Sequence, residues 1–210
     1  MMMTDEQYVE SLYKEDASLE AVHLGIQEAG MQDVSVAAGY GRLLTMLAKM
    51  SGAKAALEIG ALGGYSGICL ARGIGEDGHI TSLELLERNA EIAGKHMAEA
   101  GYGGQVAYMV GDAKESLQQL KAEGRRFDFF FIDADKEGYP VYLDYALELA
   151  NPGAVIVADN ILLRGRTTNE AKQGPAVQAV RLFNERIAAD ERLLSTVLPG
   201  YDGLAVAIVK

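Results

Sequence analysis

The sequence predicts an α/β protein with a doubly wound, mostly parallel seven-stranded sheet, an antiparallel C-terminal hairpin and extra N-terminal helices. Two observations predict this class. From about Ala53 onward, short apolar runs alternate with longer mixed segments, the pattern of strand–helix units joined by right-handed crossovers. The runs are rich in Val, Ile, Leu and Phe and do not alternate with polar residues, as expected of strands buried on both faces of a parallel sheet.

The N-terminal segment, residues 4–50, is predicted to form helices with acidic faces. Its apolar side chains at helical spacing are Leu12, Leu19, Val22 and Ile26. The length of 210 residues corresponds to about 1.4 units at roughly 150 residues per domain, so one domain is expected. We therefore expect a single domain over residues 1–210, with a helical cap at 1–50 and an α/β core at 53–210.

The core strands are predicted from five apolar runs that are each followed by a glycine or an acidic residue. They are Ala53–Ile59, Ile80–Leu83, Val106–Val110, Phe127–Ile132 and Ala154–Ala158. Helix-like stretches separate these runs. They are Ser66–Arg72, Arg88–Ala100, Ala113–Ala122 and Tyr139–Leu149. This alternation places the carboxyl ends of all five strands at one edge of a parallel sheet.

The C-terminal part departs from this alternation. A helical segment, Val177–Ala189, precedes two apolar runs, Leu193–Leu198 and Leu204–Val209. The turn-rich link Pro199–Gly203 between the runs predicts a hairpin, so the last strand should run antiparallel. The polar stretch Arg164–Gly174 is predicted to be a long loop, a kind of segment that is often functional.

Composition and charge restrict the class of protein and its partners. Apolar residues make up 49% and charged residues 23%, which excludes a disordered or fibrous chain. The net charge of −11 opposes sustained binding to nucleic acid or to anionic membranes. The single cysteine, Cys69, excludes an internal disulfide and fits a reducing compartment. With no apolar run of roughly 18–20 residues and no signal-peptide pattern, we expect a soluble, cytoplasmic protein without a membrane partner.

The glycine-rich segment Leu57–Ser66 (LEIGALGGYS) joins the first strand to a helix. Its glycines allow the backbone to approach a ligand, and the helix start offers free N–H groups. The G-x-G-x-x-G dinucleotide fingerprint fails, because Leu62 and Tyr65 occupy its second and third glycine positions. Glu84 ends the next strand, where nucleotide-binding folds hold ribose hydroxyls. The pattern favours a nucleoside ligand without a pyrophosphate; a tight turn and a solvated acid remain the alternatives.

Acidic and amide side chains follow the fourth and fifth strands. Asp133 comes after Ile132, and Asp159 and Asn160 come after Ala158. Because ligands of open parallel sheets bind outside the carboxyl ends of the strands, these three residues should lie close together. An all-oxygen set of this kind suits Mg²⁺, or else Ca²⁺ or Mn²⁺. The alternative is that the acids cap helices or pair with Arg or Lys.

Lys136 lies three residues beyond Asp133, just outside the strand. A lysine beside a bound divalent cation loses its proton more easily, since two positive charges repel each other. Such a lysine could act as a general base, although a lone surface lysine is more often only solvated. Arg164 and Arg166 could hold an acidic substrate group, a loop or a subunit interface, and Tyr139 and Tyr142 are predicted as core residues.

Four stretches together resemble one family, the cation-dependent small-molecule O-methyltransferases of the class I S-adenosylmethionine-dependent superfamily, which includes catechol and caffeoyl-CoA O-methyltransferases. They are LEIGALGGYS (57–66), FFFIDADKEGYPVYLDYAL (129–147), NPGAVIVADNILLRGR (151–166) and LPGYDGLAVAIVK (198–210). With the pattern between them, they cover the chain from about Lys54 to the C-terminus. The DADK and DN elements are far more specific than a glycine loop.

The resemblance implies a Rossmann-like methyltransferase fold, a divalent cation, and a homodimer that methylates a small hydroxylated aromatic substrate, a vicinal diphenol above all. It implies Lys136 as the general base and Asp133, Asp159 and Asn160 as metal ligands. The residues that it implies around S-adenosylmethionine are Glu58, Gly60, Ser66, Glu84, Asp112, Ala113 and, bordering that pocket, Asp133.

Three other functions compete with this interpretation. Some relatives methylate tRNA hydroxyuridine, and a local patch around Arg125, Arg126, Arg164 and Arg166 could serve that purpose within an acidic protein. A non-catalytic S-adenosylmethionine-binding protein is disfavoured by the intact set of acids, amide and lysine. A nicotinamide oxidoreductase ranks last, because the dinucleotide fingerprint fails.

Overall fold

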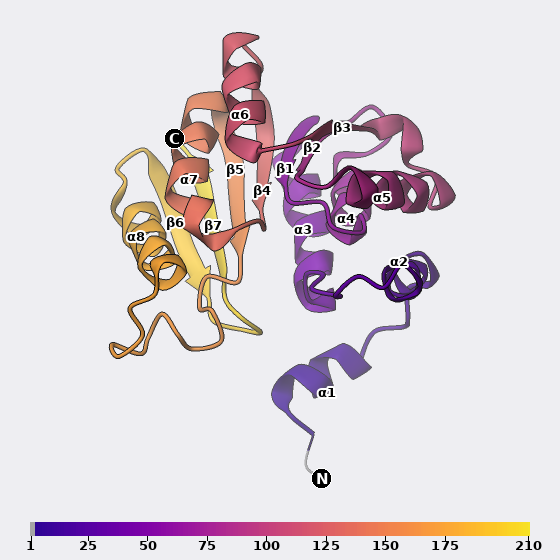
Figure 1. The fold of residues 1–210 in the computed structure, drawn as a ribbon, viewed down its shortest axis with the longest axis horizontal. Coiled ribbons are helices and arrows are strands. Elements are labelled where there is room, and N and C mark those ends of the chain that lie inside the picture. Colours follow the sequence, from indigo (N-terminus) through magenta and orange to yellow (C-terminus); the bar gives the residue numbers. More distant parts are fainter. Residues whose placement is uncertain (1–2) are drawn as a thin grey trace.

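The computed structural model describes residues 3–210 and shows one seven-stranded sheet in the order β3-β2-β1-β4-β5-β7-β6 (Figure 1). The strands are β1 Ala55–Ile59, β2 His79–Glu84, β3 Val106–Val110, β4 Phe127–Ile132, β5 Ala150–Asp159, β6 Leu193–Leu198 and β7 Leu204–Val209. Strands β1 to β5 pair in parallel, and β7 runs antiparallel to both of its neighbours. The predicted fold class is confirmed.

Helices cover both faces of the sheet. The α-helices found within residues 3–210 are α1 Asp5–Ser11, α2 Ala17–Glu28, α3 Ala38–Ser51, α4 Tyr65–Ile74, α5 Glu87–Glu99, α6 Ala113–Ala122, α7 Tyr139–Leu149 and α8 Pro175–Ala189. Short 3₁₀ turns occur at η1 Gly103–Gln105 and η2 Lys136–Gly138. One apolar core joins α6, α7 and α8 to the sheet. A second core joins α2, α3, α4 and α5 to the sheet. Along β4, Phe130 faces the first core and Phe131 the second, which explains its continuous apolar run.

The strand β5 is the element whose predicted start was wrong. The sequence placed its first residue at Ala154, whereas the strand begins at Ala150. Its register with β4 shifts between the pairs Phe127–Ala150 and Phe129–Val155, so the Asn-Pro-Gly segment forms a bulge, with Gly153 at φ 82°. Proline and glycine are tolerated at bulges, and for that reason they did not end the strand. The other predicted boundaries of the core differ by two residues or fewer.

The N-terminal helices of the predicted cap are confirmed within the described residues, and residues 1–2 lie outside them. Val22 and Ile26 are buried on α2, but Leu12 is 62% exposed. The spacing prediction failed for Leu12 because it lies just after the end of α1 at Ser11, whereas Leu19, Val22 and Ile26 lie on α2, which begins at Ala17. Helix α1 lies apart from the sheet at the edge of the molecule (Figure 1). Among residues 3–210, every helix is too short or too polar to cross a membrane.

The strand order reverses between β1 and β4. From β1 the chain proceeds outward through β2 and β3, and it then returns to build β4, β5 and the hairpin on the other side. The Gly60 amide donates to the carbonyl of Leu83 at 2.9 Å, and the Asp133 amide donates to the carbonyl of Ile59 at 2.9 Å. These bonds hold the carboxyl ends of β2, β1 and β4 together. This reversal is where open α/β sheets bind ligands.

Two helical glycines give a test of how closely α4 packs on α3. A Cβ at Gly73 would lie 2.6 Å from the Ala48 Cβ and 2.7 Å from the Thr45 carbonyl oxygen. At Gly94 on α5, the nearest atom would be Tyr108 Cε2 at 3.6 Å. We expect Gly73→Ala to lower the free energy of unfolding by about 1–3 kcal/mol, because backbone must move.

Gly94→Ala is the matched control, and it should stabilise the protein by about 0.5–1 kcal/mol through its higher helix propensity. Urea unfolding of both variants measures the difference. Equal effects of the two substitutions would show that α3 and α4 are not packed as closely as described.

Candidate active site

A cavity of about 590 Å³ lies at the carboxyl ends of β1 to β4. The predicted site residues that line it are Gly60, Ser66, Glu84, Asp112, Ala113, Asp133, Lys136 and Asn160. Glu58 and Asp159 are not among its lining residues, because both side chains are buried beneath its surface. The structure therefore brings together the residues that the sequence assigned to a nucleoside, a metal ion and a base.

The turn from β1 to α4 approaches the end of β4 so closely that only glycine fits. Gly60 has φ 100°, and a Cβ there would lie 2.1 Å from the Asp133 carbonyl oxygen. Gly64, with φ 89°, begins α4, and no side chain caps this helix start. Tyr65 and Ser66, the first residues of α4, line the cavity, so the uncapped start of this helix lies at the cavity wall.

Glu84 organises the same turn from the end of β2. Its Oε2 accepts hydrogen bonds from the amides of Ala61 at 3.2 Å and Leu62 at 3.0 Å. Its Oε1 accepts from the Leu86 amide at 3.0 Å and from Asn89 Nδ2 at 3.2 Å. Four donors hold the carboxylate in one orientation at the cavity wall, so Glu84 shapes the turn as well as bordering the ligand space.

Glu58 lies beneath Ser66 and supports it. Its carboxylate accepts from Ser66 Oγ at 2.6 Å and from Ser82 Oγ at 2.5 Å. Burial raises the pKa of Glu58 to about 7; the charges of Glu84 and Asp133 add to the rise, and the two serine hydroxyls oppose it. The predicted cofactor residue Glu58 thus acts in this structure by fixing the side chain of Ser66, which does line the cavity.

The predicted metal ligands occupy neighbouring strand ends. The register pairs Ile132 of β4 with Ala158 of β5, so Asp133 and Asp159 leave the sheet side by side. Asp159 is 2% exposed. Burial raises its pKa to about 7, and the charge of Asp133 is the next largest cause. The carboxylate of Asp159 accepts from the Asn160 amide at 2.7 Å, and Asn160 reaches the cavity from a left-handed backbone with φ 56°.

This donor set fits a hard divalent cation. Asp159 is buried and Asp133 partly buried, and Lys136 forms an ion pair with Asp133, so a further positive charge is favoured there. Residues 3–210 contain no group of three or more His, Cys, Asp or Glu side chains that could hold a metal ion, so the candidate set here includes an amide oxygen. The set Asp133, Asp159 and Asn160 has two carboxylates and one amide, a combination of oxygen ligands that suits Mg²⁺, Ca²⁺ or Mn²⁺.

Lys136 stands directly beside this set, at the start of η2. Its Nζ donates to Asp133 Oδ1 at 2.8 Å and to Tyr139 Oη at 2.5 Å. Tyr139 Oη in turn donates to the carbonyl oxygen of Asp159 at 2.8 Å. Lys136 is thereby held between the two acidic strand ends, and the alternative of a merely solvated lysine does not describe it. The pairing alternative for the acids does apply to Asp133, and Asp112 also caps α6.

Sequence reasoning missed several residues of the cavity wall. Tyr142 was expected only in the core, but it lines the cavity, and its hydroxyl donates to Asp135. The loop Val34–Val36 closes another side of the cavity. Asp135 could have been found, since it belongs to the same DADK element as the predicted residues. The loop could not, because its contact with the strand ends depends on tertiary packing.

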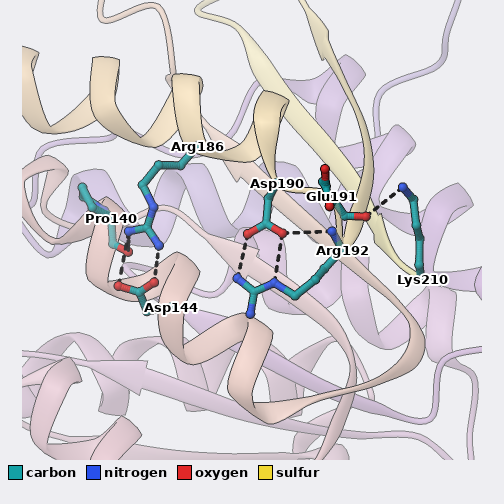
Figure 2. Close-up of polar contacts among 7 residues, drawn as sticks. All are labelled: Pro140, Asp144, Arg186, Asp190, Glu191, Arg192 and Lys210. Atoms are coloured by element: carbon teal, nitrogen blue, oxygen red, sulfur yellow. Dashed lines mark hydrogen bonds and ion pairs between the residues drawn. The ribbon is translucent and has the colours of Figure 1, made fainter.

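Arg166, one of the two arginines left open by the sequence, holds a loop. Its Nε donates to the Leu163 carbonyl at 2.9 Å. Two other arginines form ion pairs whose residues do not line the cavity, Arg186 with Asp144 and Arg192 with Asp190, as Figure 2 shows. These pairs involve α7, α8 and the segment that follows α8. They are structural contacts and serve below as controls.

Comparison with known proteins identifies the family. Residues 9–210 match the sequence model of a family described as O-methyltransferase. The chain belongs to this O-methyltransferase family. It is 40% identical over 213 residues to a catechol O-methyltransferase of Niastella koreensis, in an alignment that covers 98% of this chain and 96% of the relative. The family is that of the class I S-adenosylmethionine-dependent O-methyltransferases, so the chain is an enzyme of that class.

Solved structures of other family members have the same fold. An O-methyltransferase from Bacillus cereus in complex with SAH superposes with a TM-score of 0.92 at 40% identity, covering 99% of this chain and 98% of that one. The O-methyltransferase TomG from Streptomyces achromogenes, in complex with SAM, superposes with a TM-score of 0.91 at 37% identity, with complete coverage of both chains. These likenesses confirm the predicted methyltransferase fold, and together with the family match they disagree with a nicotinamide oxidoreductase.

The raised pKa of Glu58 gives a pH-dependent test. The folded chain holds this proton up to about pH 7, whereas the reference carboxyl loses it near pH 4.5. This stabilising contribution is complete below about pH 4.5 and is lost as the pH rises toward 7. Glutamine imitates the protonated acid. We therefore expect Glu58→Gln to exceed the parent protein in stability at pH 8 by up to about 3 kcal/mol, and to converge with it below pH 4.5.

Urea unfolding between pH 4 and pH 8 measures this difference. Glu185→Gln on the exposed face of α8 is the control, and its profile should run parallel to that of the parent. An advantage of Glu58→Gln that did not change with pH would contradict the assignment of a raised pKa to Glu58.

Proposed function

We propose that this enzyme transfers the methyl group of S-adenosylmethionine to a hydroxyl of a small vicinal diphenol, a catechol-like acceptor, with the help of a divalent cation. The observation that carries the proposal is the oxygen set of Asp133, the buried Asp159 and Asn160 at the strand ends, with Lys136 held against Asp133. The name of the Niastella koreensis relative, a catechol O-methyltransferase, supports the acceptor class.

The methyl donor would lie along the β1, β2 and β3 end of the cavity. The residues proposed to hold it are Gly60, Ser66, Glu84, Asp112, Ala113 and Asp133, with Glu58 beneath Ser66. Glu84 is fixed by four hydrogen bonds where the ribose hydroxyls are expected, and the negative charges around the turn favour a sulfonium ion. The donor and the oxygen set meet at Asp133, which borders both.

The cation, Mg²⁺ in the first place and Ca²⁺ or Mn²⁺ as alternatives, would be held by Asp133, Asp159 and Asn160. When bound, it would supply Lewis-acid chemistry that lowers the pKa of a phenol from about 10 toward neutrality. Asn160 is neutral, so the ligand set contributes only two negative charges. A vicinal pair of hydroxyls suits this site because its two oxygens can be held together, which fixes the reacting oxygen in line with the sulfur.

Lys136, in its neutral amine form, would take the proton from the reacting hydroxyl. Its Nζ is kept in place by Asp133 and Tyr139, so little rearrangement is needed to reach a hydroxyl placed at the oxygen set. In the transfer, the bond between sulfur and the methyl carbon breaks and a bond between oxygen and that carbon forms. The sulfonium becomes a neutral thioether, and the proton resides on Lys136.

An RNA acceptor is the second candidate, and the structure disfavours it. Arg125 and Arg126 precede β4, whereas Arg164 and Arg166 follow β5, so the two pairs lie toward opposite ends of these parallel strands. The cavity lies at the carboxyl ends only. The four arginines therefore do not form one patch beside the cavity, and the net charge of −11 opposes RNA binding.

The assembly, domain and location expected from the sequence remain part of this proposal: a cytoplasmic homodimer of single-domain chains, in which residues 1–50 cap the core. The open edge of the sheet at β6 supports a second copy of the chain as partner. Leu194 on β6 and Ile208 on β7 are cross-strand neighbours, and both are exposed. A second copy would remove this apolar pair from water.

A comparison of acceptors tests the substrate class. With labelled methyl donor, a vicinal diphenol should be methylated, while the same ring with one hydroxyl, or with one hydroxyl already methylated, should react poorly. The physical reason is that a single oxygen cannot be held at two points. Equal turnover of mono- and diphenols would contradict the two-oxygen arrangement. Salt-sensitive methylation of bulk tRNA in the same screen would favour the RNA acceptor instead.

Two substitutions separate the oxygen set from the lysine. Asp159→Ala, or excess EDTA, should abolish transfer and leave binding of S-adenosylhomocysteine unchanged in calorimetry, because the donor contacts lie at the other end of the cavity. Lys136→Ala should lower kcat by about 10²–10⁴-fold, the range typical of a general base. This defect should shrink as the pH rises, because the phenolate then forms without the lysine.

Asp144→Ala and Lys121→Ala are the matched controls, since both remove a charged residue from an exposed ion pair. Both should keep the parent activity. Full activity in EDTA would show that the acids are not a catalytic metal site. A Lys136→Ala defect that stayed constant from neutral to alkaline pH would remove the base assignment.

A further inference from the structure

The turn that follows β5 has an unusual concentration of left-handed residues. Asn160, Leu163 and Arg164 have φ values of 56°, 52° and 52°, and none is glycine. L-residues are disfavoured in this conformation and keep it only where surrounding contacts fix the backbone. Asn160 reaches the cavity from this turn. Its position therefore depends on whatever holds residues 160–164.

The β6–β7 turn supplies several of those contacts. The Leu162 amide donates to the Asp202 carbonyl at 2.9 Å, and the Arg164 amide donates to the Asp202 carboxylate. The Ile161 amide donates to the Gly203 carbonyl at 3.3 Å. A Cβ at Gly203, which has φ 81°, would lie 2.6 Å from Leu162 Cγ, so the two turns are in direct contact. Asp202 is the residue that binds the 160–164 turn through both its backbone and its side chain.

The β6–β7 turn is itself fixed from the N-terminal helices. Tyr40 on α3 donates through its hydroxyl to the Gly200 carbonyl at 2.6 Å. Glu6 on α1 accepts from the Tyr201 amide at 2.7 Å, and Glu10 accepts from the Tyr201 hydroxyl. Asp202 therefore projects from an anchored segment, which allows it to impose a conformation on the turn it contacts.

We propose that Asp202 is a positioning residue for Asn160, holding the left-handed turn so that Asn160 stays in the wall of the cavity that Asp133 also lines. The inference rests on the proposed function, in which Asn160 is a cation ligand. The carboxylate acts as a hydrogen-bond acceptor for the Arg164 amide. An asparagine at position 202 keeps such an acceptor, and an alanine does not. The acceptor at position 202, not its charge, is what the turn requires.

The test uses the full chain with Mn²⁺ as the probe, followed by the electron paramagnetic resonance signal of free Mn²⁺. Asp202→Ala should raise the Kd for Mn²⁺ about 10–100-fold, as removal of a group that orients a metal ligand does. Asp202→Asn should stay within about 3-fold of the parent, and the affinity for S-adenosylhomocysteine should be unchanged in both variants. Asp190→Ala is the matched control, since Asp190 also accepts from a backbone amide, that of Arg192 at 3.0 Å.

A second measurement, hydrogen exchange of peptides that contain residues 160–166, does not depend on metal binding. Asp202→Ala should speed exchange there, and Asp190→Ala should not. An unchanged Kd in Asp202→Ala, or an Asn variant as weak as the Ala variant, would overturn the proposal. The metal part of the proposed function fails if the parent protein does not bind Mn²⁺. It also fails if Asp159→Ala leaves the binding of Mn²⁺ intact. The exchange data then decide alone, and an unchanged turn in Asp202→Ala overturns the positioning role.

Discussion

The structure depends on one close approach, between the turn after β1 and the end of β4. At Gly60 there is no room for a side chain, because the Asp133 carbonyl oxygen occupies the place of a Cβ. This contact joins the two halves of the doubly wound sheet at the point where the strand order reverses. It fixes the distance between the start of α4, which faces the donor end of the cavity, and Asp133, which belongs to the acidic end. Any residue larger than glycine would push apart the turn after β1 and the end of β4, and with them the two ends of the cavity.

The second constraint is electrostatic. Glu58 and Asp159 are buried, and burial together with neighbouring acids raises the pKa of each to about 7. Each of these two carboxyl groups is kept near other acids, which lowers the stability of the folded chain. Such a loss of stability is characteristic of ligand sites. A sulfonium at one end of the cavity and a divalent cation at the other would relieve it. Under the proposed function, the acidic interior and the net charge of −11 both favour cationic ligands and disfavour nucleic acid.

How much could be predicted from the sequence depends on whether a residue acts locally. The strands β3 and β4 and the positions of Asp133 and Asp159 follow from apolar runs and from the rule that ligands bind at strand ends, and the structure agrees. The role of Glu58 could not be predicted, since Ser82 reaches it across a strand pairing 24 residues away. The contact of Asp202 with Arg164 spans 38 residues and depends on the register of β5 with β7. Local patterns do not encode such pairings.

The two ends of the cavity differ in how firmly they are built. The donor end consists of strand ends, the glycine turn and α4, all joined by backbone hydrogen bonds and covered by the apolar cores. At the other end, Asn160 lies in the turn after β5, which the β6–β7 turn contacts; α1 contacts that second turn and buries none of its own residues. Its contacts with Tyr201 and Arg42 are polar and partly exposed. Separation of α1 from the rest would expose little apolar surface, so it costs far less than opening the sheet. The strand-end side of the cavity is therefore fixed by the fold, whereas the α1 contacts behind the turn after β5 can open at a lower cost in free energy.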